Sequence, residues 1–212
     1  MDLEKEYFLL LIDLKRSTEL PNKELNEKMK ELESVLNTFN NEQKETLVLP
    51  LSISYGDEVA GLFSQLAGIY QIITELREIL HPITGIRFVV AKGKIGRRSE
   101  DIRQVGGKIF KTASRAMQNL KAENGYCSWV TGEEVRDQTL ASICELSNAL
   151  VEKMSNYQRK VYNQLKQGKS QKEVAEKLGK YTQSIWSAIQ SGKAEYIIEA
   201  EKVIDLNLEK IR

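Results

Sequence analysis

The chain has 212 residues, with 31 Lys and Arg against 30 Asp and Glu, one histidine and two cysteines. This composition excludes a polyelectrolyte and a disulfide framework, and the lone His81 argues against histidine-based acid–base chemistry. Because no apolar stretch approaches the length of a membrane span and the start of the chain is acidic, we expect no membrane segment or signal peptide and a cytosolic protein.

The hydrophobic pattern of the first 150 residues alternates between strand-like runs and amphipathic helical stretches. It predicts strands at residues 7–13, 47–54, 58–63, 86–95 and 126–130. It predicts helices at residues 22–40, 65–80, 107–121 and 140–154. Two β-α-β units with a hairpin between them indicate an α+β domain of the ferredoxin-like, split βαβ type over residues 1–150.

Two carboxylates lie at the end of a predicted strand and at the tip of a predicted hairpin, where this fold would place them at the edge of the sheet. Asp13 ends the apolar run 7–12, and Asp57 follows Gly56 at the predicted hairpin tip. If strand and hairpin are neighbours, the two acids lie close enough to bind a divalent cation, Mg²⁺ or Mn²⁺. Each acid alone also has a structural interpretation, Asp13 as a helix N-cap and Asp57 as a turn residue.

Four stretches of this domain resemble the catalytic domains of class III nucleotidyl cyclases, in the order of that family. They are LIDLKRST at 11–18, SYGDEVAGLF at 54–63, IRFVVAKGKI at 86–95 and GKIFKTASRA at 107–116. The resemblance implies a nucleotidyl-cyclase-like fold, a nucleotide ligand, and a homodimer with sites at its interface. The sequence Gly-Asp-Glu at 56–58, followed by Gly-Leu at 61–62, and the helical tail described below also resemble the SatD family.

The cyclase resemblance assigns roles residue by residue. It implies that Asp13 and Asp57 hold the metal ions, and that Arg115 is a catalytic residue with Lys111 at the position of the family's catalytic Asn. The residues that it places against phosphate groups are Lys15, Arg16, Ser17 and Thr18. The base-selecting positions depart from the family, since Ile53 replaces a lysine and Gln104 replaces an acid.

The C-terminal residues 151–212 differ in charge and pattern. Residues 151–194 carry a net charge of +6, whereas 195–212 carry −2 and 1–150 carry −3. Such a basic block between acidic segments indicates a second module with a polyanionic partner. The tail 194–211 has apolar residues at helical spacing, which favours packing or dimerisation.

Residues 155–192 predict a helix-turn-helix, with helices at 155–165, 171–178 and 182–190. Ser170 and Glu173 have the spacing of a capping box, and Gly179 supplies the turn. We expect partial burial of Ile185, Trp186 and Ile189 in the last helix. The predicted contacts to duplex DNA are Lys172, Lys177, Lys180, Gln183, Ser184 and Ser187.

The sequence therefore favours a DNA-binding regulator with a cyclase-like domain that binds a metal and a nucleotide. An active nucleotidyl cyclase, or another nucleotide-processing enzyme targeted by its tail, is the alternative. Ile53 and Lys111 favour the regulator, whereas Asp13, Asp57 and Arg115 favour the enzyme. A structural dimerisation domain and a three-helix module for protein contacts are the further alternatives.

Overall fold

The computed structural model describes residues 1–15, 22–54 and 58–211, with residues 22–26 described by their backbone only. Its strands are β1 (Glu6–Leu14), β2 (Leu47–Ile53), β3 (Glu58–Phe63), β4 (Ile86–Lys94) and β5 (Cys127–Val130). Its helices are α1 (Asn22–Glu42), α2 (Ile69–Leu80), α3 (Ile102–Val105), α4 (Lys108–Glu123), α5 (Glu134–Glu152), α6 (Asn156–Lys166), α7 (Gln171–Leu178), α8 (Thr182–Gly192) and α9 (Ala194–Leu208).

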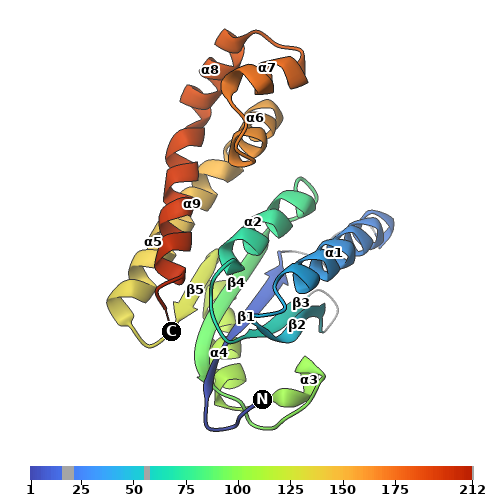
Figure 1. Ribbon diagram of the computed structural model, residues 1–212, viewed down its shortest axis with the longest axis vertical. Helices are drawn as coiled ribbons and strands as arrows, with labels where there is room; N and C mark the ends of the chain where they lie inside the picture. Colours follow the sequence, from blue (N-terminus) through green and yellow to red (C-terminus); the bar gives the residue numbers. More distant parts are fainter. Residues whose placement is uncertain (16–21, 55–57, 212) are drawn as a thin grey trace. The chain divides into compact units, whose positions relative to one another are not determined.

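The strands form one sheet in the order β2-β3-β1-β4-β5, shown in Figure 1. The pairs β2–β3, β1–β3 and β1–β4 are antiparallel, and β5 joins β4 in parallel. With α1 between β1 and β2, and α2 between β3 and β4, this topology is the predicted split βαβ arrangement. The predicted α+β, ferredoxin-like fold is therefore confirmed, with β5 as an additional edge strand.

Helices cover both faces of the sheet (Figure 1). On one face, Phe39 of α1 meets Phe63 and Tyr70 of α2 meets Phe88, each with ring centroids 6.4 Å apart. On the other face, Leu9 and its same-face neighbours pack against the apolar side of α4. Because successive strand side chains point to opposite faces, the fully apolar centre of β1 serves both cores.

A close backbone contact explains the glycines before α4. The amide of Gly96 donates to the carbonyl of Gly106 at 3.0 Å, and Gly107 has a φ of 106°. A Cβ at Gly107 would collide with the backbone nitrogen of Gly96. The glycine pair therefore lets the loop after β4 meet the start of α4.

The described chain divides into two compact units, Met1–Ala141 with Asp205–Arg212, and Ser142–Ile204. The boundary lies inside α5, as does the predicted domain limit at residue 150. The second unit is helical, and its core gathers Val161, Tyr162, Val174, Ile185 and Ile189 from α6, α7 and α8. Its fold matches the predicted all-α C-terminal region. None of the helices described is long and apolar enough to cross a membrane.

Candidate functional site

Asp13 lies near the end of β1, on the face of the sheet that α4 covers. Only 4% of the residue is exposed. The strand register places it opposite Glu58 of β3 and opposite Arg87 of β4. Glu58 directly follows Asp57 in the sequence, so the end of β1 meets the strand that begins just after the second predicted metal ligand.

Two cationic side chains meet the Asp13 carboxylate. Lys121 of α4 places its Nζ 2.6 Å from Oδ1, and Arg87 places an Nη 3.4 Å from Oδ2. The other Nη of Arg87 donates to the side chain of Asn124, which ends α4 in a left-handed conformation. The buried negative charge is therefore neutralised by residues of β4 and α4.

This arrangement does not fit a divalent cation as it stands. Mg²⁺ and Mn²⁺ are bound by oxygen ligands, whereas Asp13 brings an ammonium and a guanidinium group to the same place. Among residues 1–15, 22–54 and 58–211, no three His, Cys, Asp or Glu side chains gather into a metal-binding group. Asp57 lies outside the described residues, so the predicted Asp13–Asp57 pair stays a prediction.

The remaining residues from the cyclase resemblance are dispersed. The backbone of Lys15 is held by the turn after α2, since its amide donates to the Gly85 carbonyl at 2.8 Å and its carbonyl accepts from the Thr84 hydroxyl. Lys111 and Arg115 lie one turn apart on the exposed side of α4. The other predicted phosphate-binding residues, Arg16, Ser17 and Thr18, are outside the described part of the chain.

Sequence reasoning missed Arg87 and Lys121, the residues that contact Asp13. Arg87 could have been found by aligning strand 86–95 antiparallel to strand 7–13, because the register then pairs it with Asp13. Lys121 carries no comparable signal. Its contact depends on how the end of α4 packs over the sheet, which residue spacing alone does not reveal.

In the second unit, capping boxes stabilise the N-terminal ends of α6 and α7, the first two helices of the predicted helix-turn-helix. Ser170 caps α7: its Oγ accepts from the Glu173 amide at 3.4 Å, and the Glu173 carboxylate accepts from the Ser170 amide at 2.8 Å. The Ser170 hydroxyl also donates to the Glu173 carboxylate at 2.7 Å, and this bond, followed by the one from the Ser170 amide, lowers the pKa of Glu173. Ser155 and Gln158 form the same motif at α6. The predicted capping box at Ser170 is confirmed, and Gly179 ends α7 in the left-handed conformation.

The predicted DNA-contacting residues lie mostly on the surface. Ser184 is half-buried, and the exposed ones are Lys172, Lys177, Lys180, Gln183 and Ser187. On the opposite side of α8, Ile185, Ala188 and Ile189 are buried in the core of the unit. Helix α8 is thus fixed by its apolar face and presents a polar one.

Lys169 adds to the positive charge near α7 and was not predicted. Its ammonium group donates to the side chain of Gln164 at 2.6 Å. A shared hydrogen bond with Lys177 lowers the pKa of Lys169, and burial and repulsion from the same lysine act in the same direction. An anion placed between the two groups would relieve this repulsion. Seven residues lie between them in the sequence, so only the fold reveals the pair.

One prediction for α8 is wrong. Trp186, expected to be partly buried with Ile185 and Ile189, is 53% exposed. A step of one residue turns the helix by about 100°, which moves Trp186 away from the buried stripe. Tyr181, just before α8, is 86% exposed and was also overlooked.

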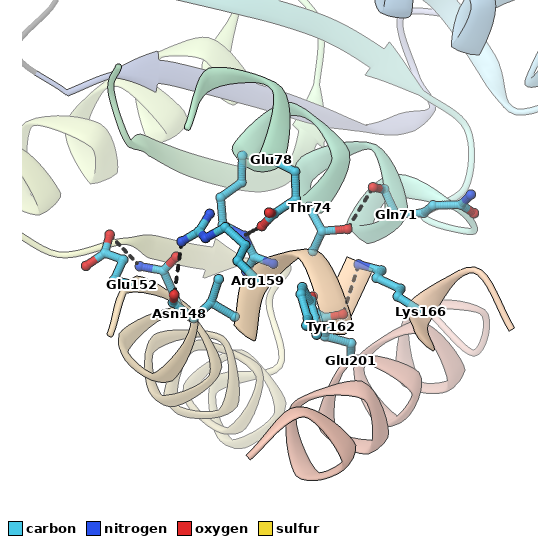
Figure 2. Close-up of polar contacts among 11 residues, drawn as sticks. Gln71, Thr74, Glu78, Asn148, Glu152, Arg159, Tyr162, Lys166 and Glu201 are labelled. Carbon is cyan, nitrogen blue, oxygen red and sulfur yellow. Dashed lines mark hydrogen bonds and ion pairs between the residues drawn. The ribbon is translucent and has the colours of Figure 1, made fainter. Parts of the chain in front are cut away.

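Part of the basic charge of this unit serves its own packing. Figure 2 shows Glu201 of α9 meeting Tyr162 and Lys166 of α6. Glu201, only 3% exposed, accepts from the Tyr162 hydroxyl at 2.7 Å and pairs with Lys166 at 2.9 Å. Arg159 is buried and donates to the Val151 carbonyl at 3.0 Å. The net +6 of residues 151–194 therefore overstates the charge available to a partner.

Comparison with known families decides the affiliation of the chain. The model of the SatD family matches residues 7–200, a span that runs from β1 into α9. The chain belongs to the SatD family. No curated protein sequence matches it. Among solved structures, this SatD-family chain is similar to a bacterial light-regulated adenylyl cyclase, at 16% identity and a TM-score of 0.41. That similarity covers 58% of this chain and 74% of the cyclase.

The family match includes both predicted functional regions of this SatD protein. It covers the strand that carries Asp13 and the helices α7 and α8 that carry the exposed lysines. The α+β unit and the helical unit are therefore parts of one SatD sequence pattern.

Proposed function

We propose that this SatD-family protein is a DNA-binding regulator, in which α7 and α8 form the contact surface for duplex DNA. The observation that carries the proposal is the division of α8 into a buried apolar face and an exposed polar one. Gln183 and Ser187 lie on the polar face, and Lys177 and Lys180 are exposed on and just after α7. A helix of this kind can enter the major groove while neighbouring lysines contact phosphate groups.

The charge near α7 supports an anionic partner. The side-chain hydrogen bond with Lys177 lowers the pKa of Lys169 most, burial and repulsion from Lys177 lower it further, and the Glu173 carboxylate raises it. DNA phosphates would add negative charge beside these two lysines. A homodimer, as predicted from the sequence, would present two copies of α8 to two half-sites of a palindromic DNA sequence.

Charge reversal tests this proposal. The triple variant Lys172→Glu, Lys177→Glu, Lys180→Glu should weaken binding to a labelled mixed-sequence duplex at low salt by roughly 100-fold, because three phosphate contacts become repulsive. Fluorescence anisotropy of the labelled duplex measures the affinity of the full-length protein.

A second triple variant controls for net charge. Lys153, Lys160 and Lys202 are exposed in the same unit but lie on α5, α6 and α9 or next to them. Their reversal to Glu changes the net charge equally and should change the affinity by less than about tenfold, since it acts only at long range. Equal losses in the two variants, or no binding by the unmodified protein, would contradict the proposal.

A metal-dependent nucleotide-binding or nucleotidyl cyclase function of the first unit is the second candidate. The register that sets Asp13 opposite Glu58, the neighbour of Asp57, favours it. The ion pair between Asp13 and Lys121 opposes it, because a metal at Asp13 must displace the ammonium group. Arg115, exposed on α4, remains available for a nucleotide phosphate.

Removal of the competing ammonium group is expected to reveal any such site. Lys121→Met should tighten Mn²⁺ binding at least about tenfold, because a like charge next to the carboxylate is lost. Isothermal titration calorimetry measures the affinity, with Lys108→Met, an exposed lysine at the start of the same helix, as the control. Identical Mn²⁺ affinities in Lys121→Met and the unmodified protein would contradict competition at Asp13.

A further inference from the structure

Trp186 interrupts an otherwise polar stripe on α8. Gln183, Trp186, Ser187 and Gln190 are spaced by three and four residues and are all exposed, so they share one side of the helix. The core of the unit is formed by the opposite side, through Ile185 and its neighbours. The indole is therefore held on the outer side by a helix that is fixed in place.

The segment just before α8 carries a further exposed aromatic residue next to a cationic one. Tyr181, 86% exposed, precedes α8 and directly follows the exposed Lys180. Tryptophan and tyrosine combine a flat apolar surface with one hydrogen-bonding group, so they suit a partner that offers both apolar and polar contacts. The exposed lysines on and just after α7 favour an anionic partner.

A DNA groove meets these requirements. Its phosphates pair with lysines, its base edges hydrogen-bond with glutamine, and the methyl group of thymine offers an apolar contact in the major groove. An acidic protein surface would satisfy the lysines but gives no specific reason for the alternation of glutamine and tryptophan along α8.

We propose that Trp186 contacts thymine methyl groups in the major groove and makes binding depend on A·T pairs beside the glutamine contacts. This inference rests on the proposed DNA-binding function. It adds a specificity-determining contact to the phosphate contacts of the lysines.

A paired substitution of protein and DNA tests the contact. The probe is a duplex that the unmodified protein enriches from a random-sequence pool. This duplex is then prepared in two forms, one with thymine and one with uracil, which differs from thymine only by the missing methyl group. Loss of the methyl groups should weaken binding of the unmodified protein about threefold. Trp186→Ala should weaken binding to the thymine duplex about tenfold and abolish the difference between the two duplexes.

Two controls isolate the role of the indole. Tyr196→Ala removes another exposed aromatic residue of the same unit, on α9, and should leave both affinities unchanged. The second control is Trp186→Phe, whose remaining tryptophan fluorescence comes from the buried Trp129. Subtracting this fluorescence from that of the unmodified protein gives the signal of Trp186. That signal should change with DNA but not with heparin, a polyanion without bases.

The outcomes separate this inference from the function on which it rests. If the protein binds DNA but Trp186→Ala binds the thymine and uracil duplexes as the unmodified protein does, the contact is overturned and the DNA-binding function stands. A preference for single-stranded DNA also overturns it. If no DNA is bound at low salt, the proposed function itself fails.

Discussion

Asp13→Ala is expected to lower the free energy of unfolding of the first unit by about 3–5 kcal/mol. Arg87, whose side chain is 13% exposed, would lose its carboxylate partner and leave a buried charge without compensation. Urea denaturation followed by the fluorescence of the buried Trp129, in a Trp186→Phe background, reports on this unit. The substitution acts on stability whether or not a metal ever binds Asp13.

Two further variants separate the partners of Asp13. Lys121→Met should cost only about 0–1 kcal/mol, because the lysine side chain is 44% exposed and solvent screens its charge. Asp13→Asn should be less harmful than Asp13→Ala, since the amide oxygen can still accept a hydrogen bond from Arg87. A loss below about 1 kcal/mol in Asp13→Ala would show that Arg87 does not depend on this carboxylate.

Glu201→Ala is expected to destabilise the second unit by about 3 kcal/mol. The substitution removes the carboxylate that Tyr162 and Lys166 share between α6 and α9, in surroundings where only 3% of Glu201 is exposed. Urea denaturation followed by the difference in fluorescence between proteins with and without the Trp186→Phe substitution reports on this unit, because Trp129 belongs to the first unit.

The control for this prediction is Glu199→Ala, an exposed acid on the same helix, which should change stability by less than about 0.5 kcal/mol. Tyr162→Phe removes only the hydroxyl and should cost about 1 kcal/mol. If Glu201→Ala and Glu199→Ala were equally stable, the contact seen in Figure 2 would contribute nothing to the fold.

Much of the fold follows from hydrophobic periodicity, because strands and helices here bury regular apolar stripes. The exceptions are the short helix α3, which was not predicted, and the start of a longer helix. Helix α5 begins at Glu134 rather than at residue 140, and its first turn carries the 79% exposed Val135. That turn is held by Asp137, whose carboxylate accepts from the amide and the hydroxyl of Thr131 at 2.8 and 2.6 Å. This polar contact leaves no apolar pattern in the sequence.

The candidate site was predicted only in part, for a physical reason. The sequence placed Asp13 near the start of β3 only on the condition that strand and hairpin are neighbours, and the register of β1 and β3 meets that condition. The groups that neutralise Asp13 come from β4 and α4, and the neighbour of Lys177 comes from the turn before α7. The contacts of Lys121 and Lys169 depend on packing between elements, which residue types and spacing do not specify.

The salt dependence of DNA binding tests the central proposal most directly. If Lys172, Lys177 and Lys180 each contact a phosphate, their joint replacement by Gln should reduce the slope of log affinity against log salt concentration by about 2.7. The same replacement at Lys153, Lys160 and Lys202 should leave the slope unchanged. An equal slope for the unmodified protein and the first variant would contradict DNA binding through α7 and α8.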